Sequence, residues 1–79
     1  MNYSDKMHLL TAKQFERIHG KMEDYIGIDG STVLHVFVPT NHDCPYIGIR
    51  YKDGSLYVYG CRVDRKVTED ELLHYMSLT

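Results

Sequence analysis

The sequence lacks long apolar runs, and it contains only two cysteines. No run approaches the roughly 18 residues that a membrane helix needs, and the N-terminal stretch lacks the basic-then-apolar order of a secretory signal. We therefore expect a cytoplasmic protein with no membrane partner. In that compartment Cys44 and Cys61 should be reduced, whereas secretion would favour a disulfide between them.

A strong charge of either sign is also missing. Nine basic and eleven acidic residues give a formal net charge of -2. This is too little for the extended acidic surface of a DNA mimic, and it is the wrong sign for a strong nucleic-acid binder. There is no Gly-rich phosphate loop and no paired-carboxylate spacing, so we predict no cofactor and no enzymatic activity.

The composition that remains is that of a folded protein. The hydrophobic fraction is 43% and the charged fraction 25%, near ordinary globular values. The 79 residues allow one domain, expected over 1–79, with a modest core and a narrow margin of stability.

Two helices are predicted, one near each end of the chain. Residues 11–26 carry apolar side chains at helical spacing, and Thr11 with Gln14 matches a capping box. Residues 69–77 are preceded by a second such pair, Thr68 with Glu71. Residues 1–10 are expected to be flexible.

Three strands are predicted between the helices, at 32–38, 46–52 and 55–63. Asp53 and Gly54 favour a two-residue hairpin turn between the last two strands. The expected fold is α+β in the order α-β-β-β-α, a three-stranded antiparallel sheet with both helices packed on one face.

A two-residue turn also predicts which side chains share a face. It pairs Tyr51 with Leu56 and Ile49 with Val58, so the aliphatic residues, including Leu34, face the helices. The outward residues are then His35, Phe37, Tyr46, Arg50, Tyr57, Tyr59 and Cys61.

This aromatic outer face has two explanations. Tyrosine is a good strand former whose hydroxyl can stay in water, so the face can be purely structural. Tyrosine and arginine are also enriched at the energetic centres of protein interfaces. We predict a small non-catalytic protein-binding module, an adaptor or an inhibitor of the kind that phages and mobile elements encode, with self-association as the nearest alternative. The predicted binding residues are His35, Phe37, Tyr46, Arg50, Tyr57 and Tyr59.

The expected order of elements is similar to that of the double-stranded RNA-binding domain and of small ribonuclease toxins. The resemblance is one of topology only, and it implies a nucleic-acid-binding or ribonuclease-like alternative. Such a domain uses basic residues at the start of its last helix to contact phosphates. Here that helix opens with Glu69, Asp70 and Glu71, which would repel phosphate.

Metal and histidine chemistry complete the candidates. His42, Cys44 and Cys61 are weak metal-ligand candidates, because the paired short spacing of a structural zinc site is missing at Cys61. The other histidines lie mostly in separate segments with no implied pocket: His8, His19 and His74. We predict no metal site and no catalytic residue.

Overall fold

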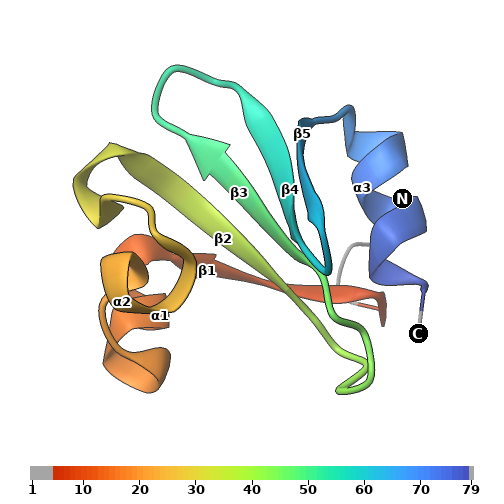
Figure 1. The fold of residues 1–79 in the computed structure, drawn as a ribbon, viewed down its shortest axis with the longest axis horizontal. Coiled ribbons are helices and arrows are strands. Elements are labelled where there is room, and N and C mark those ends of the chain that lie inside the picture. Colours follow the sequence, from red (N-terminus) through yellow and green to blue (C-terminus); the bar gives the residue numbers. More distant parts are fainter. Residues whose placement is uncertain (1–4, 79) are drawn as a thin grey trace.

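The computed structural model describes residues 5–78. Its elements, in chain order, are β1 (Met7–Thr11), α1 (Ala12–His19), α2 (Met22–Ile26), the 3-10 helix η2 (Gly30–Thr32), β2 (Val33–Pro39), β3 (Ile47–Tyr51), β4 (Leu56–Gly60), β5 (Val63–Lys66) and α3 (Glu69–Met76) (Figure 1). None of the helices formed by these residues is long and apolar enough to cross a membrane.

The five strands form one antiparallel sheet in the order β1-β2-β3-β4-β5 (Figure 1). The expected three-stranded sheet is therefore wrong. One additional strand, β1, lies almost entirely in the stretch 1–10, which was expected to be flexible. Residues 1–4 of that stretch lie outside the described residues. The topological similarity to the double-stranded RNA-binding domain depended on three strands, so it is lost as well.

The other additional strand, β5, follows a turn at Cys61 and Arg62 that lies inside the predicted strand 55–63, so only Val63 of β5 was predicted to be in a strand. Gly60 pairs with Val63 across this two-residue turn. Arg62 has a positive φ of 59°, a conformation that is uncommon for a residue with a side chain. The turn was missed because neither of its residues is a typical turn former.

The predicted helix 11–26 is two short helices. Gly20 ends α1 with a φ of 100°, which a helix cannot continue. The carboxylate of Glu16 then accepts a hydrogen bond from the Met22 backbone N–H at 2.8 Å, which satisfies a free donor at the start of α2. Both predicted capping boxes are confirmed, at Thr11 for α1 and at Thr68 for α3.

The helices lie on opposite faces of the sheet, not on one face as expected. We call these the α1 face, which α1 and α2 cover, and the α3 face (Figure 1). Val36 belongs to the cluster under α1 and α2, whereas the next residue, Phe37, belongs to the cluster under α3. Because successive strand residues point to opposite faces, the sheet contributes side chains to two separate cores.

The β3–β4 hairpin has a three-residue loop in place of the predicted two-residue turn. Tyr51 accepts from the Gly54 N–H and donates to the Ser55 carbonyl, both at 2.9 Å, and Gly54 has a φ of 94°. This is the three-residue hairpin that requires glycine in the left-handed conformation. Ile49 consequently pairs with Tyr57, one residue away from the predicted Val58.

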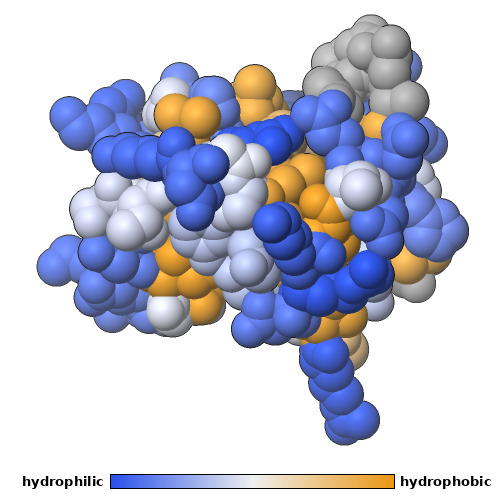
Figure 2. All heavy atoms as spheres, turned by 90° about the horizontal axis from the view of Figure 1, so that it is seen from above, coloured by the Kyte–Doolittle hydropathy of each residue, from blue (hydrophilic) through white to orange (hydrophobic). Residues whose placement is uncertain are grey.

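A second irregularity lies in β2, where the register shifts between Val33 and His35. Leu34 sits at this bulge and is 45% exposed, although the sequence predicted it to face the core. Within residues 5–78, the other large apolar side chains that are exposed are Leu9, Ile18 and Tyr25. Figure 2 shows apolar atoms in separate areas between hydrophilic side chains.

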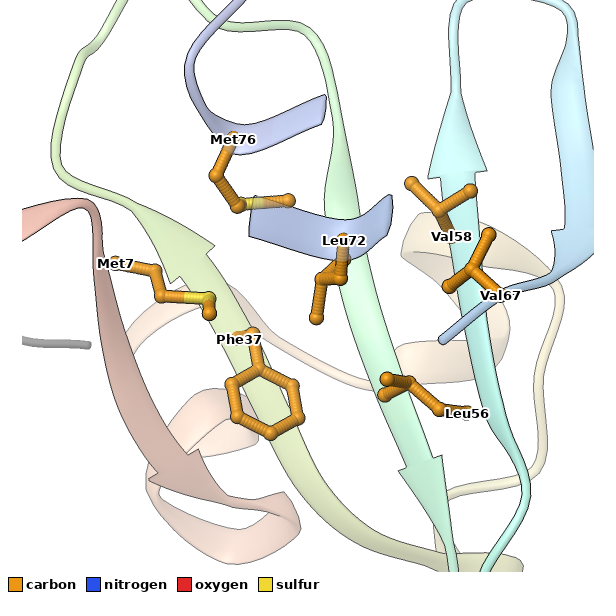
Figure 3. Packing of buried hydrophobic residues seen from close by; sticks show 7 residues of the cluster. All are labelled: Met7, Phe37, Leu56, Val58, Val67, Leu72 and Met76. Carbon is orange, nitrogen blue, oxygen red and sulfur yellow. The ribbon is translucent and has the colours of Figure 1, made fainter. Parts of the chain in front are cut away.

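The cluster under α3 draws its buried strand residues from three of the five strands. Figure 3 shows its buried members: Met7, Phe37, Leu56, Val58, Val67, Leu72 and Met76. They come from β1, β2, β4, α3 and the segment that leads into α3. A Cβ atom on Gly48 of β3 would lie 2.8 Å from the Leu72 methyl groups, so glycine lets α3 approach the sheet closely.

Candidate functional site

The α1 face is covered over only part of its width. α1 packs on β1 and β2, and β4 and β5 extend beyond α1 and α2 (Figure 1). Three half-buried tyrosines lie together at the border of this part, Tyr51 at the end of β3 and Tyr57 and Tyr59 on β4, and we call them the tyrosine surface. Tyr51 and Tyr59 also pack against the cluster under α1 and α2. The Tyr57 and Tyr59 rings are stacked 6.1 Å apart, and the Tyr51 ring meets Tyr57 edge-on at 5.5 Å.

The hydroxyl groups of Tyr51 and Tyr59 are hydrogen-bonded to each other at 2.5 Å. Burial, followed by this hydrogen bond, raises the pKa of Tyr59 well above its usual range. Tyr59 is therefore a neutral phenol whose hydroxyl is already engaged. It offers its ring to a partner, which suits stacking and apolar contact rather than proton transfer.

Charged residues of β5 border the tyrosine surface. Asp64 pairs with Tyr59 across the strands, and Lys66 pairs with Tyr57, so each shares the face of its tyrosine. Both charged residues are exposed. The arrangement of an aromatic centre beside a charged rim is typical of protein contact surfaces.

A groove of about 630 Å³ continues from the tyrosine surface. Val38, Ile47 and Tyr59 come from the sheet, His19 and Tyr25 come from α1 and α2, and further lining residues come from the segment that precedes β3. The groove is thus formed where three parts of the chain, distant in sequence, come together.

One wall of the groove is a set of three packed rings. The centroid of the Phe15 ring lies 4.7 Å from that of His19 and 5.6 Å from that of Tyr25. The Phe15 and Tyr25 rings meet edge to face. His19 and Tyr25 complete the set at 5.8 Å. Phe15 is buried, whereas His19 and Tyr25 are exposed, so the outer rings are held by a ring in the core.

The lining of the groove is nearly free of charge. Among the described residues that line it there are two histidines, His19 and His42, and there is no aspartate, glutamate, lysine or arginine. Asn41 adds a polar group at the rim, and its side-chain oxygen accepts the Asp43 backbone N–H at 2.9 Å. Such a lining suits an uncharged ligand better than an ion.

The structure does not bring the six predicted binding residues together. Phe37 is buried in the cluster under α3, and His35 pairs with Arg50 on that same face. Arg50 forms an ion pair of 2.8 Å with Glu69. These positions are corrections to the expected outer face, and they have two causes: α3 covers the face that carries His35, Phe37 and Arg50, and the one-residue difference in hairpin register moves Tyr57 and Tyr59 to the other face.

The remaining predicted residues are near the groove. Tyr57 and Tyr59 belong to the tyrosine surface, and Tyr46 lines the groove while its ring packs edge-on against Tyr75 at 5.0 Å. Cys61, also predicted to point outward, is exposed in the turn between β4 and β5.

The three candidate metal ligands, His42, Cys44 and Cys61, differ in their surroundings. Cys44 is buried, and its thiol donates to the Tyr75 carbonyl at 3.3 Å. His42 and Cys61 are exposed. Within residues 5–78 there is no group of three or more histidine, cysteine, aspartate or glutamate side chains that could hold a metal ion.

Several residues of the site were not predicted to bind, among them His19, Tyr25, Asn41 and Tyr51. His19 and Tyr25 were assigned to one continuous helix. Tyr51 was expected at the margin of the core, and it does pack against the cluster under α1 and α2. α2 folds back beside α1 because Gly20 has a positive φ. The only signal of this break in the sequence is the glycine itself, which is a weak one.

Comparison of the chain with protein-family models, with curated proteins and with solved structures found no match.

Proposed function

We propose that this protein is a non-catalytic protein-binding domain, an adaptor or inhibitor of a larger protein, and that it binds through the tyrosine surface and the adjoining groove. One observation carries the proposal: three half-buried tyrosine rings are packed together on the α1 face, where the sheet begins to extend beyond α1 and α2. Tyrosine supplies a large, rigid contact area with little loss of conformational entropy, and it dominates binding energy at many interfaces.

The rigidity of the surface supports this proposal. Tyr51, Tyr57 and Tyr59 stand on adjacent strands of one sheet and are held by ring contacts and by a hydroxyl pair. A preorganised surface loses little freedom on association, so a modest contact area can still give useful affinity.

We place this binding in the cytoplasm. Cys44 and Cys61 are both free thiols in the structure, and free cysteines are typical of reducing compartments.

The test is site-specific photo-crosslinking in the cells that produce the protein. A benzophenone amino acid at position 57 should crosslink one specific protein, because Tyr57 is at the centre of the proposed contact. The matched control carries the same probe at Asp70, an exposed position of α3 on the opposite face, and should give no such product.

The affinity of the captured partner should depend on the Tyr57 ring. We expect Tyr57→Ala to weaken binding about 30-fold, the effect of an interface residue that contributes about 2 kcal/mol. Equal crosslinking at positions 57 and 70, or only a crosslinked second copy of the chain, would contradict the proposed partner. Saturable binding of labelled RNA or DNA that Tyr57→Ala weakens would replace it with a nucleic acid.

A further inference from the structure

The groove beside the tyrosine surface has the size of a ligand site. Its volume is about 630 Å³. Sites that bury drug-sized ligands have volumes of roughly 300–1,000 Å³. There is therefore room for an aromatic ring together with the peptide groups on either side of it.

The ring contacts in the groove define what fits it. Phe15, His19 and Tyr25 form one wall with tilted and edge-on rings, and Tyr59 contributes a ring from the sheet. A ring that entered between them would meet both faces and edges of aromatic partners, the arrangements that aromatic pairs prefer. Val38 and Ile47 supply apolar contact from the strands.

The lack of carboxylate, ammonium and guanidinium groups among the described lining residues disfavours ionised ligands. A charged group in the groove would lose water without gaining a carboxylate, ammonium or guanidinium partner from the described lining residues, which is unfavourable. The hydroxyl of Tyr59 is engaged with Tyr51, and this pairing keeps the sheet side of the groove neutral.

Asn41 provides the directional contact. Its side-chain oxygen accepts from the Asp43 N–H, so its amide nitrogen keeps two N–H donors at the rim of the groove. A peptide carbonyl next to a bound side chain is an acceptor suited to this position.

We infer that the groove binds an uncharged aromatic side chain of the partner protein, and this inference rests on the proposed function. A peptide carbonyl next to that side chain accepts a hydrogen bond from the Asn41 amide. Tyr59 belongs both to the groove and to the tyrosine surface, so a partner that lies on the tyrosine surface reaches the groove without a gap.

The first experiment uses a model compound, so that the partner need not be known. N-acetyl-tyrosinamide, titrated into the ¹⁵N-labelled protein, should shift the amide signals of groove residues such as Ile47 and Tyr59 in a saturable way. N-acetyl-alaninamide carries the same peptide groups without the ring and should not do so at the same concentrations.

Two variants assign the binding to the groove. Val38→Phe puts a larger side chain into the lining of the groove and should abolish the saturable shifts. Asn41→Asp keeps the acceptor for the Asp43 N–H but removes the amide donors, and should weaken binding roughly five-fold, the value of one neutral hydrogen bond. Lys13→Gln changes the net charge by the same amount at an exposed position outside the groove, and should bind like the wild type.

Shifts that do not saturate, that occur equally with the alanine compound, or that are the same in Asn41→Asp and the wild type would overturn the inference. The outcome is distinguishable from failure of the proposed function. If position 57 still crosslinks a partner while N-acetyl-tyrosinamide does not bind, only the groove inference fails. If the compound binds and no protein is crosslinked, the part of the inference that assigns the ring to a partner protein is overturned.

Discussion

Tyr59 is the residue that joins the tyrosine surface to the groove. Its ring is stacked on Tyr57, and its hydroxyl is bonded to Tyr51. Burial is the first cause of its raised pKa, and the Tyr51 hydroxyl is the second. The folded protein therefore holds this phenol neutral at pH values where a phenol in an unfolded chain ionises.

The raised pKa predicts a specific loss of stability in alkali. The unfolded phenol ionises near pH 10, whereas the folded one does not. The contribution of the Tyr59 hydroxyl to the free energy of unfolding is therefore complete below about pH 10. It decreases as the pH rises above that value, because ionisation of the phenol then favours the unfolded state.

The measurement is the urea midpoint of the wild type and of Tyr59→Phe between pH 8 and 11. We expect the midpoint of the wild type to fall more steeply above about pH 10 than that of the variant. Parallel curves would show that the Tyr59 hydroxyl is as accessible to ionisation in the folded protein as in the unfolded one.

At the scale of the element, the β3–β4 hairpin decides which side chains are buried and which are available. The three-residue loop 52–54 pairs Ile47 with Tyr59 and places both on the α1 face. A two-residue loop would have placed Tyr59 on the other face. Because the side-chain period of a strand is two, one residue in a loop reverses the facing of a whole strand.

This register predicts opposite roles for two aromatic residues that were expected to share a surface. Phe37 is 7% exposed in the cluster under α3, so Phe37→Ala should lower the free energy of unfolding by about 3–5 kcal/mol. Tyr57→Ala should cost about 0.5–1.5 kcal/mol, the contribution of an aromatic pair.

Urea unfolding of both variants checks the assignment. A larger loss for Tyr57→Ala than for Phe37→Ala would mean that the faces are reversed and that Phe37 is the residue available to a partner.

For the molecule as a whole, the sheet is a wall shared by two cores. The cluster under α1 and α2 is centred on Phe15, Met22, Val33, Val36 and Ile49. The cluster under α3 uses other side chains of the same strands. Unfolding of the strands that line one cluster therefore also disrupts the other cluster.

A chain of 79 residues is stabilised by about 4–12 kcal/mol at typical values per residue. Leu72 is 1% exposed and packs from α3 against the sheet, so Leu72→Ala should remove about 2–5 kcal/mol of this margin. Because the strands are shared, we expect both cores of this variant to unfold in one transition.

Circular dichroism and tyrosine fluorescence, followed through the same urea titration of Leu72→Ala, report secondary structure and the tyrosine surface respectively. Coincident curves support a single cooperative unit. Loss of helix signal at lower urea than the fluorescence change would show that α3 detaches separately.

Local features of the fold were predictable from the sequence. Both capping boxes depend on side chains three residues apart, and the β3–β4 turn depends on the glycine at position 54, so their signals lie within a few residues. The β4–β5 turn was not predictable, because Arg62 adopts its positive φ without a typical turn sequence. Of the candidate site, Tyr57 and Tyr59 were identified, but their neighbours His19 and Tyr25 were not.

Short-range signals in the sequence determine where α1 and α3 begin, where the β3–β4 turn lies and where β2, β3 and β4 form, because capping, turn chemistry and strand propensity act over short distances. The tertiary structure decided which face each strand presents and which residues meet in the groove. β2 and β4 carry large side chains on both sides, so alternation alone cannot choose a face for them. The choice follows from the length of one loop and from the packing of α3 against Gly48. Together they place Tyr57 and Tyr59 on the α1 face, where β4 and β5 extend beyond α1 and α2.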